Sequence, residues 1–81
     1  MLQRSGIPVV RVIGPFERPV VLWQDGMTLA EVILTAGYLE TRDPSQLVIQ
    51  RGATALPVDP RKLLQGEDVP VEPGDVIQVV P

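Results

Sequence analysis

The chain has 81 residues, of which 44% are hydrophobic and 21% charged, and its net charge is −3. This length corresponds to one domain, and the hydrophobic content excludes a natively unfolded chain. The acidic balance and the scatter of only seven cationic residues exclude a basic surface for nucleic acid and disfavour an anionic membrane surface. Because there is no cysteine, disulfides, thiolate chemistry and cysteine-based zinc sites are excluded.

We expect residues 1–6 to form a loose lead-in; they lack the apolar core of a signal peptide. We expect residues 7–81 to form a single domain. No apolar run approaches the ~18 residues that cross a bilayer, so we expect no direct membrane insertion by this segment. Thirteen valines favour strands.

Two strands are predicted first, over residues 7–14 and 19–24, and their short connection indicates a hairpin. Gly14 and Pro15 end the first strand. Asp25 and Gly26 then form a turn that leads into the next element.

The clearest element is a helix over residues 28–37. Thr28 and Glu31 have the spacing of a capping box, in which each side chain accepts from an unpaired backbone N–H at the helix start. Apolar residues recur at the i, i+3, i+4 and i+7 positions of one face, from Leu29 to Ala36. Gly37 can adopt the left-handed conformation that ends a helix. We interpret this helix as a packing element without chemistry of its own.

Three more strands are predicted, over residues 47–51, 54–58 and 76–80. Asp59-Pro60 resembles an N-cap followed by proline at the first helical position, and predicts one helical turn through residue 65. Pro73-Gly74 fits the centre of a type II turn before the last strand.

This order predicts an α+β fold with β-grasp (ubiquitin-like) topology. The sheet would be mixed, with four to five strands, one main helix and one short helix. A hairpin, a helix that crosses one face, and strands that return beside the first would place the first and last strands parallel in the middle of the sheet.

Several stretches together match one family pattern. The first strand reads V-R-V-I-G at residues 10–14, and the helix T-L-A-E-V-I-L-T-A-G is similar to T-L-x-x-A-I-x-x-A-G-G. A strand ends in Arg51, a Leu-Leu turn follows, and V-E-P-G-D-V-I-Q-V at residues 71–79 is similar to L-x-P-G-D-V-I-x-V. The chain resembles the SLBB (soluble-ligand-binding β-grasp) domain of bacterial polysaccharide export proteins. Val20 and Tyr38 stand where that pattern has glycine.

The resemblance implies a non-catalytic interaction or ligand-binding module of a capsule or exopolysaccharide export protein. Such a module would lie in the periplasm or cell envelope and mediate oligomer packing or glycan contact. Its partners would be other domains or copies of the same export protein, or the polysaccharide.

The residues themselves offer no catalytic constellation. The chain has no histidine and no cysteine, Ser5 and Ser45 have no candidate base, and no glycine-rich phosphate loop is present. We therefore predict no enzyme activity, and no catalytic, cofactor-binding or metal-binding residue.

An interface is predicted from the alternation of the strands. In the first strand Arg11 and Ile13 alternate with two valines, and in the last strand Val76 and Gln78 alternate with Ile77 and Val79. Because the helix covers only one face, the other face stays largely apolar, as expected where another domain or subunit packs. The alternative is that valine is simply a good strand former and that loops cover this face.

Three other side chains are candidates for contact with a partner. Trp23 and Tyr38 combine an apolar face with a polar tip, as in rings that mark interfaces or stack on sugars. Arg51 at a strand end is a candidate to pair with a carboxylate of a partner. The alternatives are partial burial at the rim of the core for the rings and a solvated strand end for Arg51.

The remaining singled-out residues have structural interpretations, as turns and caps: Gly14, Thr28, Glu31, Gly37, Gly74 and Asp75. Asp75 is expected to accept from backbone N–H groups of its own turn. With Glu67, Asp68 and Glu72 it forms an acidic run whose spacing fits no calcium loop, and which we interpret as a solvated face.

Two alternatives belong to other functional classes. Ubiquitin-like and sulfur-carrier proteins also have a short β-grasp with a T-L-x-E helix and a late G-D-x-V strand. Their chemistry needs a flexible C-terminal Gly-Gly, whereas this chain ends in Q-V-V-P. The other alternative, an SLBB-like domain of a redox complex subunit, would need cofactor motifs outside this sequence.

Overall fold

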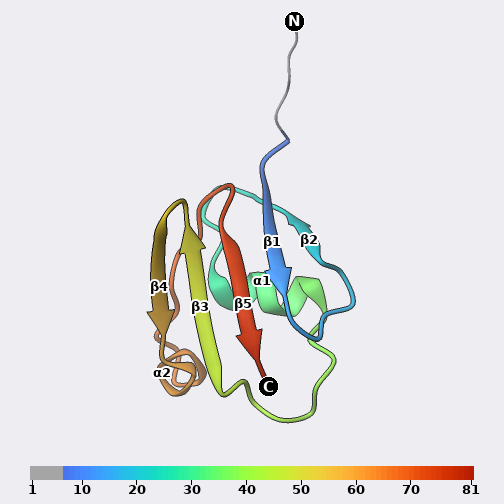
Figure 1. Ribbon diagram of the computed structural model, residues 1–81, viewed down its shortest axis with the longest axis vertical. Helices are drawn as coiled ribbons and strands as arrows, with labels where there is room; N and C mark the ends of the chain where they lie inside the picture. The colour runs from blue at the N-terminus through green and yellow to red at the C-terminus, as the bar shows by residue number, and fades with distance from the viewer. Residues whose placement is uncertain (1–6) are drawn as a thin grey trace, which may run out of the picture.

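The computed structural model describes residues 7–81, and the predicted lead-in, residues 1–6, lies outside the described residues. The described chain has an α+β fold with a five-stranded mixed sheet and two helices, as the sequence predicted at this level (Figure 1). The elements in chain order are β1 (Val9–Ile13), β2 (Val20–Leu22), α1 (Leu29–Ala36), β3 (Gln46–Arg51), β4 (Thr54–Val58), α2 (Pro60–Leu64) and β5 (Val76–Val80).

The strand order in the sheet is β2-β1-β5-β3-β4. β1 and β5 are parallel, with Arg11 opposite Val76, and every other neighbouring pair is antiparallel. The predicted parallel pairing of the first and last strands is therefore confirmed, with β5 as the central strand.

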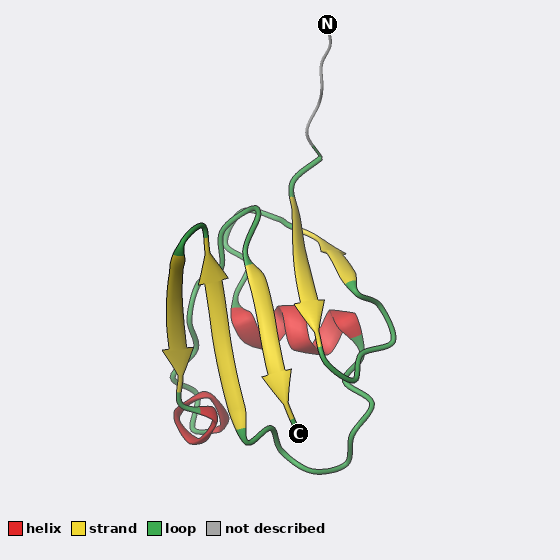
Figure 2. Ribbon diagram, viewed as in Figure 1, coloured by secondary structure: helices red, strands yellow, loops and turns green. Residues whose placement is uncertain are grey.

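One face of this sheet carries the core. α1 crosses behind the strands in Figure 2, whereas α2 lies at the end of β4. Buried side chains of β1, β2, β3 and β5 pack with those of α1 and with two from connections, Met27 and Val71. They form one hydrophobic cluster: Val10, Val12, Val21, Met27, Leu29, Val32, Ala36, Leu47, Ile49, Val71, Ile77 and Val79.

The ends of α1 agree with the sequence prediction. The Glu31 N–H donates to Thr28 Oγ1 (3.4 Å), the Thr28 N–H donates to Glu31 Oε1 (3.2 Å), and Gly37 has the left-handed φ of 76°. The sequence did not predict that Asp68 also accepts, from the Ala30 N–H (3.1 Å). A carboxylate from a distant loop therefore satisfies one more free donor at the helix start.

The second helix agrees with the prediction except at its end. Asp59 accepts from the Arg61 N–H (2.9 Å) and Pro60 occupies the first turn, but the helix ends at Leu64. It is thus one residue shorter than predicted.

β1 and β2 are both shorter than predicted, and the register between them runs only from Val9 opposite Leu22 to Arg11 opposite Val20. Beyond it, the segment that joins the two strands turns toward α1. The Glu17 and Arg18 N–H groups donate to the carbonyls of Gly37 and Ala36 (both 2.9 Å). This connection therefore satisfies carbonyls at the C-terminal end of α1, which a helix cannot pair internally.

Gly14, at the end of β1, allows a close backbone approach. Its φ is 141°, and a Cβ built on it would lie 2.6 Å from the carbonyl oxygen of Val79. Neither the conformation nor the distance permits a side chain.

We predict that Gly14→Ala lowers the free energy of unfolding by about 3 kcal/mol or more, because the added methyl group meets backbone atoms of the central strand. Gly52→Ala is the matched control, since Gly52 has a φ of 58° but open space around its Cα. It should cost only about 1 kcal/mol. Urea denaturation of the two variants measures the difference, and equal losses would contradict this reading of Gly14.

Candidate interaction surfaces

The face of the sheet opposite α1, which we call the open face, is built from every second residue of the five strands. The strand registers align these residues in rows across the sheet. One row contains Val20, Arg11, Val76, Gln50 and Ala55, and the next contains Ile13, Gln78, Val48 and Pro57. Val9 and Leu22 lie beyond the first row, and Val80 and Gln46 beyond the second.

The open face is largely apolar and exposed. Leu22 is 61% exposed, Ile13 54%, Val80 47% and Val20 41%, whereas Val48 and Val76 are half-buried between their neighbours. The predicted alternation is confirmed, because the intervening residues of β1 and β5 are buried against α1.

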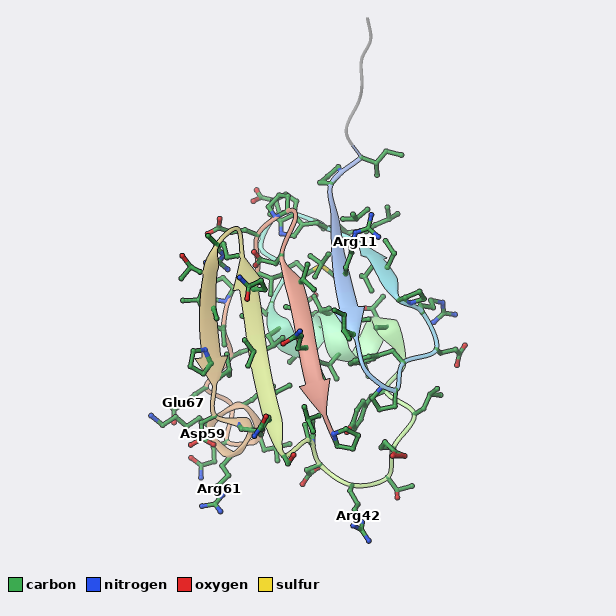
Figure 3. The ribbon with its side chains drawn as sticks, in the orientation of Figure 1. Arg11, Arg42, Asp59, Arg61 and Glu67 are labelled. Atoms are coloured by element: carbon green, nitrogen blue, oxygen red, sulfur yellow. The ribbon has the colours of Figure 1, made fainter. Side chains whose placement is uncertain are left out.

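Charge is almost absent from this face. Arg11 is the only charged residue on it within the five described strands, and the other polar side chains are the amides of Gln46, Gln50 and Gln78. Figure 3 shows Arg11 over β1, while Arg42, Asp59, Arg61 and Glu67 project from the lower end of the molecule, away from the strands.

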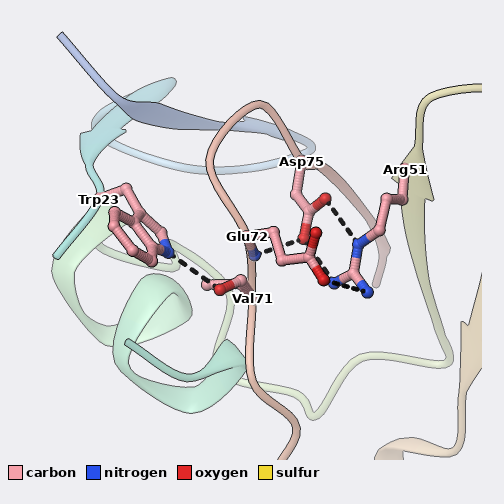
Figure 4. A network of polar contacts seen from close by, with 5 residues as sticks. All are labelled: Trp23, Arg51, Val71, Glu72 and Asp75. Carbon is pink, nitrogen blue, oxygen red and sulfur yellow. Dashed lines mark hydrogen bonds and ion pairs between the residues drawn. The ribbon is translucent and has the colours of Figure 1, made fainter. Parts of the chain in front are cut away.

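A second polar feature lies at the opposite end of β5 from the C-terminus. Asp75, only 1% exposed, accepts two hydrogen bonds from Arg51, from Nε (3.0 Å) and from Nη2 (2.8 Å). It also accepts from the Glu72 N–H (2.8 Å), and the exposed Glu72 carboxylate lies 3.2 Å from Arg51 Nη1 (Figure 4).

Two opposing effects act on the pKa of Asp75. Burial alone would raise it, but the hydrogen bonds from Arg51 and from the Glu72 N–H, with the Arg51 charge, outweigh burial and lower the pKa below its usual value. The Arg51 pKa is raised in turn, mainly by the hydrogen bond to Asp75. This pair is therefore ionised on both sides and is a structural contact.

These contacts confirm one interpretation and correct two. Asp75 accepts from its own turn, as predicted. The interpretation of the acidic run as a solvated face is wrong for Asp75, which is buried, and incomplete for Asp68, which caps α1. Arg51 is neither a solvated strand end nor free for a partner's carboxylate, because its partner lies within the chain.

The two aromatic candidates do not lie on the open face. Trp23 is half-buried against the core, and its Nε1 donates to the Val71 carbonyl (2.9 Å; Figure 4). Tyr38 packs on Phe16 with 5.5 Å between ring centroids. Burial, and then the nearby carboxylates of Glu40 and Asp43, raise the pKa of its hydroxyl. Both rings thus follow the alternative interpretation, the rim of the core.

Sequence analysis missed a cleft on the helix side of the molecule. It lies between α1, residues 38–44 and α2, and its volume is about 520 Å³. Leu34 and Leu64, 82% and 62% exposed, are among its lining residues. Both leucines were visible in the sequence, but no local pattern indicated that the two helices would lie close together.

The described residues contain no group of three or more acidic side chains arranged to hold a metal ion. Among residues 7–81, no helix is long and apolar enough to cross a membrane.

We predict that Arg51→Met lowers the free energy of unfolding by about 3 kcal/mol at pH 7, because it leaves the buried Asp75 carboxylate without its partner. Glu72→Gln is the control; since that pair is exposed, it should change stability by less than about 1 kcal/mol. Chemical denaturation measures both, and similar costs would contradict the assigned role of Asp75.

The pH dependence of the same contact has a definite sign. Because the Asp75 pKa is lowered by folding, the pair's stabilisation is fully present above the unfolded value of about 3.9 and is lost as the pH falls through the folded value. In Arg51→Met, burial acts without Arg51 and the carboxyl protonates at higher pH. The cost of this substitution should therefore shrink as the pH falls from 7 toward the ordinary pKa of a carboxyl group.

No family model, curated protein or solved structure matches the chain.

Proposed function

We propose that residues 7–81 form a β-grasp module of the SLBB type that binds another protein surface without catalysing a reaction. The strand order β2-β1-β5-β3-β4, the parallel pairing of β1 with β5 and the single helix across one face support this topology. The motifs that resemble polysaccharide export proteins support the family, and lie in those elements.

The observation that carries the proposal is the open face. Single exposed apolar residues are common on protein surfaces, but a contiguous patch marks an interaction site. Here Val20, Leu22, Ile13 and Val80 are exposed on three adjacent strands, and Arg11 is the only charged residue on this face within the described strands. Nothing in the described chain covers them, so the alternative that loops fold over this face receives no support.

The proposed setting is a capsule or exopolysaccharide export protein of the periplasm or cell envelope, where this face would contact another domain or another copy of the same protein. Packing is favoured over glycan contact because Trp23 donates its indole N–H within the chain and Tyr38 packs on Phe16. A flat aliphatic face suits protein contact better than sugar stacking.

The carrier alternative needs a mobile C-terminal tail. Here Ser45 donates from its N–H to the Val80 carbonyl (2.7 Å) and from Oγ to the Pro81 carbonyl (3.0 Å). These hydrogen bonds hold residues 80 and 81 to the start of β3, so neither of them is part of a mobile tail.

We predict that Ile13→Asp weakens the assembly that contains this domain at least tenfold, because it places a charge in the apolar patch. The domain should stay folded, since the side chain already contacts solvent. Leu34→Asp is the matched control, an exposed apolar residue on the opposite side. Sedimentation velocity of the native assembly and circular dichroism of the two variants are the measurements. If Ile13→Asp and Leu34→Asp affect the assembly equally, the open face is not the interaction surface.

The proposed setting has its own test, fractionation of the source cells with an antibody against residues 7–81. A band much larger than 8.8 kDa in the envelope fraction is the expected result. A band near 8.8 kDa in the cytoplasmic fraction would contradict the export-protein proposal.

A further inference from the structure

We infer that the open face binds the open face of a second copy of this chain, around a two-fold axis that runs along β5. The inference rests on the proposed function, because it names the partner of the same surface. It follows from the strand registers and from the distribution of the few polar side chains.

A two-fold axis along the central strand superposes the rows of the two sheets. β5 then faces β5 of the other copy, β1 faces β3, and β2 faces β4, because these strands lie at equal distances from β5. Each residue meets the residue of the same row on the opposite side of β5. Facing sheets lie about 10 Å apart, so side chains of both copies fill the space between them.

The resulting contacts match in chemistry. Val76 meets Val76 and Gln78 meets Gln78, whose amides can donate to and accept from each other. Ile13 meets Val48, so two aliphatic side chains are buried together.

The charged side chain of Arg11 also meets a polar partner. Arg11 meets Gln50, whose amide oxygen can accept from the guanidinium. The two Arg11 side chains lie on opposite sides of the axis, so like charges do not meet. The acidic residues Asp59 and Glu67 lie at the end of the molecule near α2, away from this contact (Figure 3).

Other axes match less well. An axis across the strands would place Arg11 against Ile13 and Val76 against Gln78, which buries polar groups against aliphatic ones. An axis along β1 would place Arg11 against Arg11. An axis along β3 would leave β1 and β2, with Ile13 and Leu22, outside the contact.

The size of the face sets the strength of the contact. Five strands of about five residues span roughly 24 by 17 Å, which is smaller than the ~800 Å² per partner of a stable interface. The dimer should therefore be weak and reversible. It should become stable only where several such domains of one assembly associate at the same time.

The absence of cysteine from the chain allows a direct test with single-cysteine variants and a bismaleimide linker about 10 Å long. Gln78→Cys lies on the axis and should give a covalent dimer. Val20→Cys and Ala55→Cys lie two strands from the axis, so each lies roughly 20 Å from its own copy and should not cross-link alone. A mixture of these two variants should give the heterodimer, with at least tenfold more product than either alone.

Two further variants control for collision and misfolding. In the Gln78→Cys background, Ile13→Asp should reduce the cross-linked dimer at least tenfold and Leu34→Asp should leave it unchanged. Circular dichroism establishes that each variant is folded. No dimer from Gln78→Cys at millimolar protein, or efficient self-linking of Val20→Cys, would overturn the inference.

The result also separates the inference from the proposed function. If Gln78→Cys does not cross-link while Ile13→Asp still disrupts the native assembly, the open face binds a different surface and only the two-fold inference fails. If Ile13→Asp disrupts neither the cross-linked dimer nor the native assembly, both the two-fold inference and the proposed function fail.

Discussion

A helix of eight residues has to cover a sheet of five strands, and most features of this molecule follow from that mismatch. The helix is about 12 Å long, whereas the sheet is roughly 24 Å wide. The core is therefore completed by side chains from the connections and from α2, among them Phe16, Trp23, Tyr38, Val69 and, from α2, Leu63. No other element of the described chain packs on the open face. Its valines and isoleucine favour strand formation, but their side chains contact solvent.

The turn before β5 holds this last strand in the middle of the sheet, between β1 and β3. Gly74 donates its N–H to the Val9 carbonyl (2.8 Å), and the Arg11 N–H donates to the Asp75 carbonyl (3.0 Å). The Asp75 carboxylate contacts Arg51 at the end of β3. The turn before β5 thus contacts both neighbouring strands, β1 through the backbone and β3 through the buried Asp75 carboxylate.

Features that depend on neighbouring residues, such as caps and turns, were predicted correctly from the sequence. The capping box at Thr28 and Glu31, the C-cap at Gly37 and the prolines near the turns act on neighbouring residues, so their effects could be predicted. The bounds of β4 and β5 and the two faces of β1 were predicted for the same reason.

Contacts between distant residues were not predicted, because nothing in a local pattern identifies the partner. Arg51 and Asp75 were singled out separately, but their pairing depends on β3 and β5 being neighbours. The cap from Asp68 to α1 and the cleft beside Leu34 and Leu64 likewise appear only when separate segments meet. The sequence indicated an apolar open face, but only the registers show which residues share a row.

The central position of β5 also bears on how the chain folds during synthesis. Translation completes the β1–β2 hairpin and the β3–β4 hairpin before residues 76–80 exist, and no strand lies between them until those residues emerge. At roughly 5–20 residues per second, a nascent chain spends seconds with two incomplete half-sheets, each with an unpaired edge and exposed valines. The parallel partner of β1 lies almost the whole chain away, which makes the final pairing slow.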